Sequence, residues 1–103
     1  MKHIILACNA GMSTSYLVKK MQKAAEEQGV EAEIKAVPVT EAAQYIDKCD
    51  VMLLGPQIRY ELPKMKKTID GRIPVDVIDM RDYGAVNGKK VLDHALQLIE
   101  ERN

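Results

Sequence analysis

The sequence predicts an α/β fold in which helices cover both faces of a parallel sheet. Three short runs, 4–7, 51–54 and 75–78, are apolar or nearly so, as expected of strands that are buried on both sides. Segments with the helical spacing of apolar residues separate them, so strands and helices alternate along the chain. Such alternation is typical of parallel strands joined by right-handed helical crossovers.

The first half of the chain is predicted to form strand, helix and strand in turn. Residues 4–7 form the first strand, so Cys8 lies where that strand ends. The segment 14–28 gathers its apolar residues on one helical face. Residues 31–36 then alternate between apolar and polar with period two. This alternation predicts a strand that is exposed on one side and lies at an edge of the sheet.

The second half of the chain continues the alternation of helices and strands. Thr40 is expected to cap a short helix that ends near Ile46, and the unbroken run 51–54 predicts a central strand. The remaining elements are predicted as a helix over 61–70 with Pro63 in its first turn, a strand over 75–78, a loop over 79–84 and a last helix opened by Asn87-Gly88. All 103 residues are expected to form one domain.

The segment Cys8-Asn9-Ala10-Gly11-Met12-Ser13-Thr14-Ser15 joins the first strand to the first helix. Small residues allow a sharp turn in which several backbone N–H groups point inward, and the helix start adds unpaired donors. Such a loop binds anions, and its donors favour the thiolate, the nucleophilic form of cysteine. The alternative is that Cys8 is simply a small buried residue at a strand end.

The spacing also invites comparison with small cysteine-dependent phosphatases, whose loop places an arginine six residues after the cysteine. Here Thr14 holds that position, and no Lys or Arg lies between Cys8 and Tyr16. Without a guanidinium the loop is poorly equipped to stabilise the charge of a hydrolytic transition state. The residues therefore favour relay of a phosphoryl group over its hydrolysis.

Three motifs together carry a resemblance to a known family. They are the loop 8–15, the segment Leu53-Leu54-Gly55-Pro56-Gln57-Ile58-Arg59-Tyr60, and Val77-Ile78-Asp79 followed by Tyr83-Gly84. Their order and separation closely resemble the enzyme IIB component of the sugar phosphotransferase system, lactose/cellobiose type, over essentially the whole chain. The resemblance implies strand order 2-1-3-4 in a fold like that of low-molecular-weight tyrosine phosphatases. The loops 8–15 and 55–60 would then flank one crevice at the carboxyl ends of the strands.

The same resemblance implies a phosphotransferase. The cysteine matching Cys8 takes a phosphoryl group from a phosphohistidine of the IIA protein and transfers it to a sugar, expected to be a β-linked disaccharide, that enters through the membrane protein IIC. The residues expected to hold the phosphoryl group are Asn9, Ala10, Gly11, Met12, Ser13, Thr14 and Ser15. For Ser13 and Thr14, helix capping is an equal alternative, and Ser15 is favoured as structural.

Residues around the loop have open roles. Met12, Ile58, Tyr60 and Tyr83 are candidates for an apolar docking surface, although core packing is favoured for Ile58. Asp79 and Asp82 could supply an acid to the crevice, but turn or capping roles are favoured. Arg59 is expected to face solvent or a partner.

Composition excludes several classes of function. Lys plus Arg and Asp plus Glu number 15 each, so no basic excess favours nucleic acid or an anionic membrane. No apolar run reaches the length of a membrane span, and because Met1-Lys2-His3 leads straight into the first predicted strand, we expect no signal peptide. We expect a cytoplasmic protein, monomeric when isolated, that reaches the membrane only through IIC.

Neither a metal site nor a cofactor is predicted. The two cysteines, Cys8 and Cys49, lack the Cys-x-x-Cys spacing of zinc and redox sites and are expected at opposite ends of the strands. Cys49 is therefore interpreted as structural, and neither His3 nor His94 as a ligand or base.

The sequence leaves two other functions open. One is a small cysteine-dependent phosphatase or an arsenate-reductase-like enzyme on the same scaffold, against which Thr14 argues. The other is a regulatory module that binds an anion without forming a covalent bond.

Overall fold

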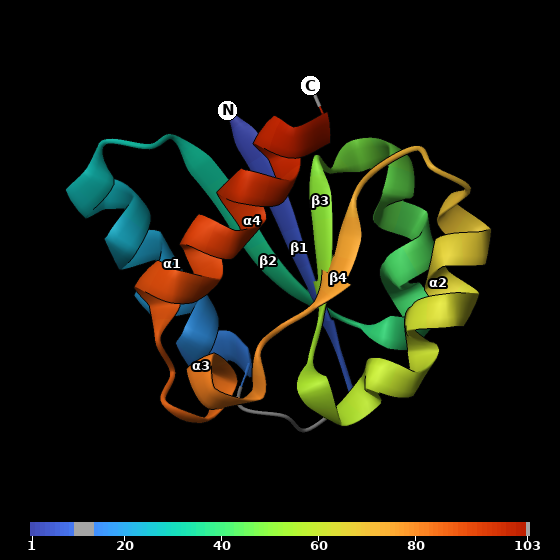
Figure 1. Ribbon diagram of the computed structural model, residues 1–103. Helices are drawn as coiled ribbons and strands as arrows, with labels where there is room; N and C mark the ends of the chain where they lie inside the picture. The colour runs from blue at the N-terminus through green and yellow to red at the C-terminus, as the bar shows by residue number, and fades with distance from the viewer. Residues whose placement is uncertain (10–13, 103) are drawn as a thin grey trace.

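The computed structural model describes residues 1–9 and 14–102, and its centre is a sheet of four parallel strands (Figure 1). The strand order is β2-β1-β3-β4, as the sequence predicted. Long apolar side chains of β1 and β3 are completely buried, whereas exposed and buried residues alternate along much of the edge strand β2. The strands are β1 (Lys2–Cys8), β2 (Ala32–Pro38), β3 (Val51–Leu54) and β4 (Val75–Val77).

All four strands end at the same side of the sheet, which we call the carboxyl edge (bottom of Figure 1). Cys8 stands in register with Pro38 of β2, and Ala7 with Leu54 of β3. Backbone hydrogen bonds continue just past the strand ends: the N–H of Gly55 donates to the carbonyl of Ala7 at 2.9 Å. The carboxyl edge therefore places Cys8 beside the loop that leaves β3.

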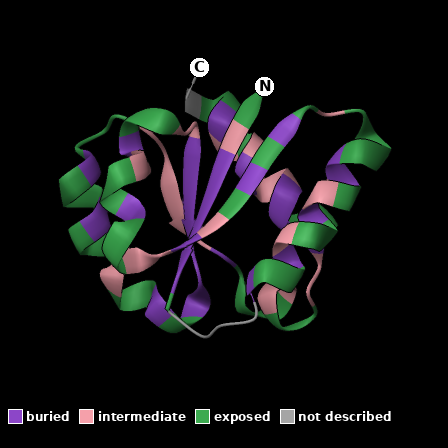
Figure 2. Ribbon diagram, turned by 180° about the vertical axis from the view of Figure 1, so that it is seen from behind, coloured by how far each residue is buried: buried purple, intermediate pink, exposed green. Residues whose placement is uncertain are grey.

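Helices cover both faces of the sheet (Figure 2). Alternation along β1 divides the core, because Ile4 and Leu6 join one hydrophobic cluster and Ile5 and Ala7 the other. The first cluster takes its helical side chains from α1 (Thr14–Gln28) and α4 (Gly88–Arg102). The second takes them from η1 (Val39–Lys48), η2 (Pro56–Glu61) and α2 (Leu62–Ile69).

Two predicted elements differ from those observed. The segment after β2 is the 3₁₀ helix η1, and its N-cap is Pro38 in extended conformation, not Thr40. The helix begins at once where the strand ends, so Thr40 lies inside it. The predicted loop over 79–84 contains a short helix, α3 (Met80–Gly84), because the Asp79 side chain accepts hydrogen bonds from two backbone N–H groups and starts a helical turn.

The predicted start of α2 is confirmed. Glu61 is its N-cap and Pro63 lies in its first turn, where a missing N–H costs no internal hydrogen bond. Asp70 closes the helix in the left-handed conformation, with φ of 52°. The 3₁₀ helix η2, which precedes α2, was not predicted. No helix in the described ranges is long and apolar enough to span a bilayer.

Candidate functional site

Cys8 is the last residue of β1 and lies at the carboxyl edge. Only 8% of its surface is exposed, and its thiol donates a weak hydrogen bond to the carbonyl of Val37, with 3.6 Å between Sγ and oxygen. The neighbouring strand β3 ends in register with Ala7. The adjacent strands β1 and β3 lie where the strand order changes direction, from β1 toward β2 on one side and from β3 toward β4 on the other. Ligands of open α/β sheets usually bind at this point. The structure thus places a lone thiol at this point.

The loop that follows Cys8 is only partly described. Ala10, Gly11, Met12 and Ser13, which were predicted to hold a phosphoryl group, lie outside the described residues. Asn9 is exposed directly after the strand.

The two hydroxyl residues at the start of α1 have different surroundings. Ser15 is exposed in the first turn, whereas Thr14 is 2% exposed.

Thr14 is joined to a distant part of the chain. Its Oγ1 lies 3.2 Å from the phenolic oxygen of Tyr83 in α3, which is hydrogen-bond distance, and either hydroxyl can donate. Tyr83 is half-buried and packs against the cluster beneath α1 and α4. Its hydroxyl is therefore engaged within the protein, which counts against the predicted docking role.

Asp79 and Asp82 lie at the start of α3, the helix that contains Tyr83. Oδ1 of Asp79 accepts hydrogen bonds from the N–H groups of Arg81 and Asp82, at 2.8 and 3.2 Å. The capping role favoured for Asp79 is confirmed, and the carboxylate is committed to the start of α3. Asp82 lies in the first turn of that helix.

A groove of about 240 Å³ separates η2 from α3 at the carboxyl edge. Arg59 lies exposed at the groove, and its Nη1 donates to the carbonyl of Pro56 at 3.2 Å. This bond holds the guanidinium to its own helix. The groove is lined by Pro56, Gln57, Arg59, Met80, Tyr83 and Gly84.

Among the described residues near this edge, the large apolar side chains that are more than half exposed are Tyr16, Tyr60 and Met80, which we call the apolar rim. They belong to α1, η2 and α3, three of the elements that follow the strand ends at the carboxyl edge. Of the three, only Tyr60 was predicted. Tyr16 could have been found because it lies off the apolar face of its helix, and Met80 because it follows a strand end.

Ile58 does not belong to this surface. It is 0% exposed and packs in the cluster beneath α2, so the core packing favoured for it is confirmed and its candidate place in a docking surface is wrong. Its neighbour Tyr60, two residues on, is 69% exposed. The opposite burial of the two residues follows from the turn of η2, an element that was not predicted.

Cys49 lies at the opposite end of the sheet, because it precedes Val51, which stands in register with Ile4 near the start of β1. Burial raises the pKa of its thiol from 9.0 to about 11, and the charges of Asp50 and Asp47 add to the effect. A thiol that stays protonated at neutral pH is a poor nucleophile. The structural interpretation of Cys49 fits these surroundings.

Both histidines pair with carboxylates away from the loop. His94 Nε2 lies 2.9 Å from Asp76 Oδ2, which ties α4 to β4. His3 lies near Asp50 at the start of β1, with 3.7 Å between its Nδ1 and Oδ2 of the carboxylate. Across 1–9 and 14–102, no three His, Cys, Asp or Glu side chains are grouped to hold a metal ion.

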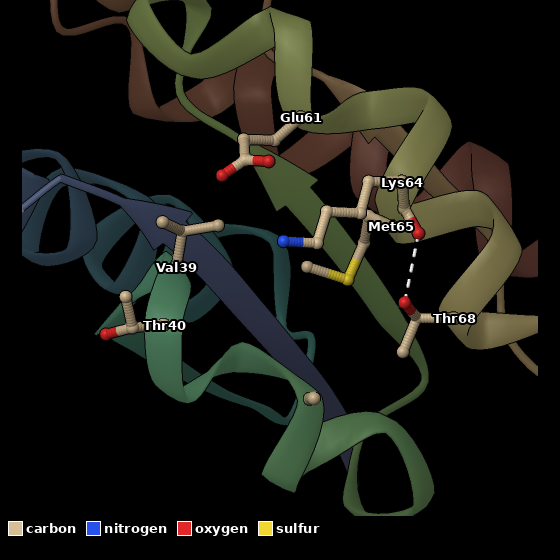
Figure 3. Close-up of a pocket in the computed structure, with 7 residues that line it drawn as sticks. Val39, Thr40, Glu61, Lys64, Met65 and Thr68 are labelled. Carbon is tan, nitrogen blue, oxygen red and sulfur yellow. Dashed lines mark hydrogen bonds between the residues drawn. The ribbon is translucent and has the colours of Figure 1, made fainter.

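A second cavity, of about 320 Å³, lies between η1 and α2 (Figure 3). Val39 and Met65 supply apolar surface, and the Lys64 side chain extends across the space. Thr68 donates its hydroxyl to the Lys64 carbonyl at 3.0 Å. Glu61 also lines this cavity, which was not predicted.

The sequence is similar to those of known proteins along nearly its whole length. A family model described as "PTS system, Lactose/Cellobiose specific IIB subunit" matches residues 3–94. The oligo-beta-mannoside-specific EIIB component of Bacillus subtilis is 46% identical over 96% of this chain and 97% of its own length. The cellobiose-specific EIIB component of Lactococcus lactis subsp. lactis is 44% identical over 95% and 96%.

Solved structures extend the similarity to three dimensions. The solution structure of a cellobiose-specific IIB component from Borrelia burgdorferi has a TM-score of 0.83 and 36% identity, over 99% of this chain and 94% of that one. The fold is also shared, at 14% identity, with a YwlE mutant from Bacillus subtilis. That alignment has a TM-score of 0.51 and covers 96% of this chain and 94% of the other.

Proposed function

The chain belongs to the lactose/cellobiose-specific IIB family of the sugar phosphotransferase system, and we propose that Cys8 carries the phosphoryl group in its reaction. As an IIB component the protein is a phosphotransferase. The observation that carries the proposal is the position of Cys8, a lone thiol at the end of a central strand where the winding of the sheet reverses. The following residues, 9–15, are proposed to hold the phosphoryl oxygens.

The proposed reaction has two steps. In the first, the N–P bond of a phosphohistidine on IIA breaks and an S–P bond to Cys8 forms, while the thiol proton replaces the phosphoryl group on the histidine nitrogen. In the second, the S–P bond breaks and an O–P bond to a sugar hydroxyl forms, and the hydroxyl proton returns to sulfur. Each step exchanges one proton for one phosphoryl group, so neither needs a cofactor.

The surroundings of Thr14 support transfer over hydrolysis. In the phosphatase-like spacing this position would hold an arginine, whereas here a buried hydroxyl is bonded to Tyr83. Arg59, which lines the groove, donates a hydrogen bond to the Pro56 carbonyl. Without a guanidinium to stabilise the hydrolytic transition state, a phosphoryl group on sulfur would survive long enough to be passed on.

The partners follow from the proposed steps. IIA delivers the phosphoryl group, and IIC presents the sugar, which we infer to be a β-linked disaccharide because relatives are specific for cellobiose and oligo-beta-mannosides. The apolar rim is suited to docking because exposed Tyr and Met side chains are enriched at protein interfaces. These partners would place the protein on the cytoplasmic side of the membrane.

Mass spectrometry tests the covalent step. The protein is incubated with IIA that is phosphorylated on histidine, and we expect a mass increase of one phosphoryl group located on Cys8. The Cys8→Ser variant should gain no phosphocysteine and should not support sugar phosphorylation by membranes that contain IIC. Cys49→Ser is the matched control and should behave as the unmodified protein.

Three results would contradict the proposal. A stable complex with phosphorylated IIA that never yields an adduct would favour a regulatory module. Rapid hydrolysis of an aryl phosphate by the isolated protein would favour the phosphatase alternative. Unchanged sugar phosphorylation by Cys8→Ser would remove Cys8 from the reaction.

A further inference from the structure

The hydroxyl pair Thr14 and Tyr83 connects the start of α1 to α3 across 69 residues of sequence. Thr14 is nearly fully buried and Tyr83 is half-buried, so water competes weakly for this hydrogen bond. Thr14 is also the first helical residue after the loop that begins at Cys8. The position of this residue is therefore fixed partly from α3.

Tyr83 is itself held firmly in place. Its N–H donates to the Asp79 carbonyl at 2.9 Å, and the Asp79 side chain caps the turn from which the tyrosine extends. Asp79 follows Ile78, whose N–H donates to the Leu54 carbonyl at the end of β3. Hydrogen bonds, joined by short covalent segments, thus connect the central sheet through α3 to Thr14.

We propose that Tyr83 is a positioning residue for phosphoryl transfer at Cys8 and acts through Thr14. This inference rests on the proposed function of Cys8 and reassigns Tyr83 from partner docking. Each hydroxyl carries one proton, and the bond between them uses only one. When Tyr83 donates, the Thr14 proton is left to donate to an oxygen of the phosphoryl group carried by Cys8.

For Tyr83 to position the Thr14 hydroxyl, the geometry of their contact matters more than its contribution to the stability of the fold. A hydroxyl that must meet a phosphoryl oxygen in the transition state acts only when its rotamer is locked by a neighbour. Loss of the phenolic oxygen would free the Thr14 hydroxyl to rotate. The rate of transfer would then fall while the affinity for the donor protein stays the same.

The test compares Tyr83→Phe with the unmodified protein in the transfer of phosphoryl groups from IIA phosphorylated on histidine. We expect kcat to fall about fivefold, the effect of one lost neutral hydrogen bond, with KM unchanged. Tyr45→Phe, which removes a phenolic oxygen from η1, is the matched control and should leave both constants unchanged. Thr14→Ser, which keeps a hydroxyl, should transfer faster than Thr14→Val.

A double-variant cycle shows whether Tyr83 acts through Thr14. Addition of Tyr83→Phe to Thr14→Val should slow transfer no further, because the bonded partner is already gone. Thermal unfolding of each variant separates a loss of fold from a loss of rate.

Several outcomes would overturn the inference. A kcat for Tyr83→Phe within twofold of the unmodified protein is one of them, and a raised KM with unchanged kcat, which would indicate docking, is another. Additive effects in the cycle would show that Tyr83 does not act through Thr14. Absence of any Cys8 adduct in the unmodified protein would instead refute the proposed function, so the two failures are distinguishable.

Discussion

Gly88, the first residue of α4, lies against the backbone of Lys20 in α1: a Cβ added to Gly88 would stand 2.4 Å from the Lys20 carbonyl carbon. Real Cβ atoms do not approach other atoms this closely. The atoms that would have to move belong to the backbone of α1 and not to a flexible side chain. Glycine at this position therefore permits the close packing of α1 on α4.

Gly88→Ala is expected to destabilise the protein by about 2 kcal/mol, the typical cost of overpacking, although alanine is the better helix former. Gly84→Ala is the matched control, because nothing lies within 4 Å of its added Cβ, and its free energy of unfolding should change by less than about 0.5 kcal/mol. Urea unfolding of both variants measures the difference. Equal stabilities would show that the two helices can separate at little cost.

The parts of the fold that were predicted correctly depend on local pattern. The strand Val51–Leu54 was predicted to the residue because its four apolar side chains are buried on both sides. The helix α3 was missed because one turn is too short to show periodicity and depends on a single cap, Asp79. The 3₁₀ geometry of η1 likewise leaves no signature in the spacing of apolar residues.

The features of the candidate site also differ in whether local sequence predicts them. Cys8 could be placed from sequence because it follows a strand and precedes a helix with small residues between. The contact between Thr14 and Tyr83 could not, because it joins residues 69 positions apart and depends on how α3 packs. Ile58 and Tyr60 were both candidates for the docking surface because both are apolar, although core packing was favoured for Ile58. The turn of η2 is what buries Ile58 and exposes Tyr60.

Ile58→Ala is expected to lower the free energy of unfolding by about 3 kcal/mol, because it leaves a cavity in the cluster beneath α2. Tyr60→Ala, two residues away and largely exposed, should change it by less than about 0.5 kcal/mol. Urea unfolding compares the two. A small effect of Ile58→Ala would mean that the site collapses around the shorter side chain.

Tyr60→Ala should instead weaken the docking of IIA. Truncation of a central interface tyrosine commonly costs about 1 to 2 kcal/mol, so KM for phosphorylated IIA is expected to rise about tenfold while kcat stays the same. Steady-state transfer kinetics measure both constants. A tenfold loss of kcat at constant KM would place Tyr60 in the transfer step and not in docking.

Cys49 should make the free energy of unfolding depend on pH in the alkaline range. Its pKa is raised from 9.0 to about 11 in the folded protein, so the folded state holds the thiol proton more tightly than the unfolded state does. The resulting stabilisation is fully present below about pH 9 and is lost as pH rises toward about 11. Urea unfolding across this window should show a steeper decline for the unmodified protein than for Cys49→Ser, and parallel curves would contradict the raised pKa.

Asp79 should affect both stability and transfer, since it caps α3 and so places Tyr83. Asp79→Ala is expected to cost about 1 kcal/mol of unfolding free energy, the usual value of an N-cap, and to lower kcat in the same direction as Tyr83→Phe. Asp79→Asn keeps an oxygen that can accept from the N–H groups of Arg81 and Asp82, so it should restore most of both properties. An acid that protonates a leaving group would behave differently, because the amide cannot donate a carboxylic proton. Transfer kinetics that fall equally in the Ala and Asn variants would therefore favour acid catalysis over capping.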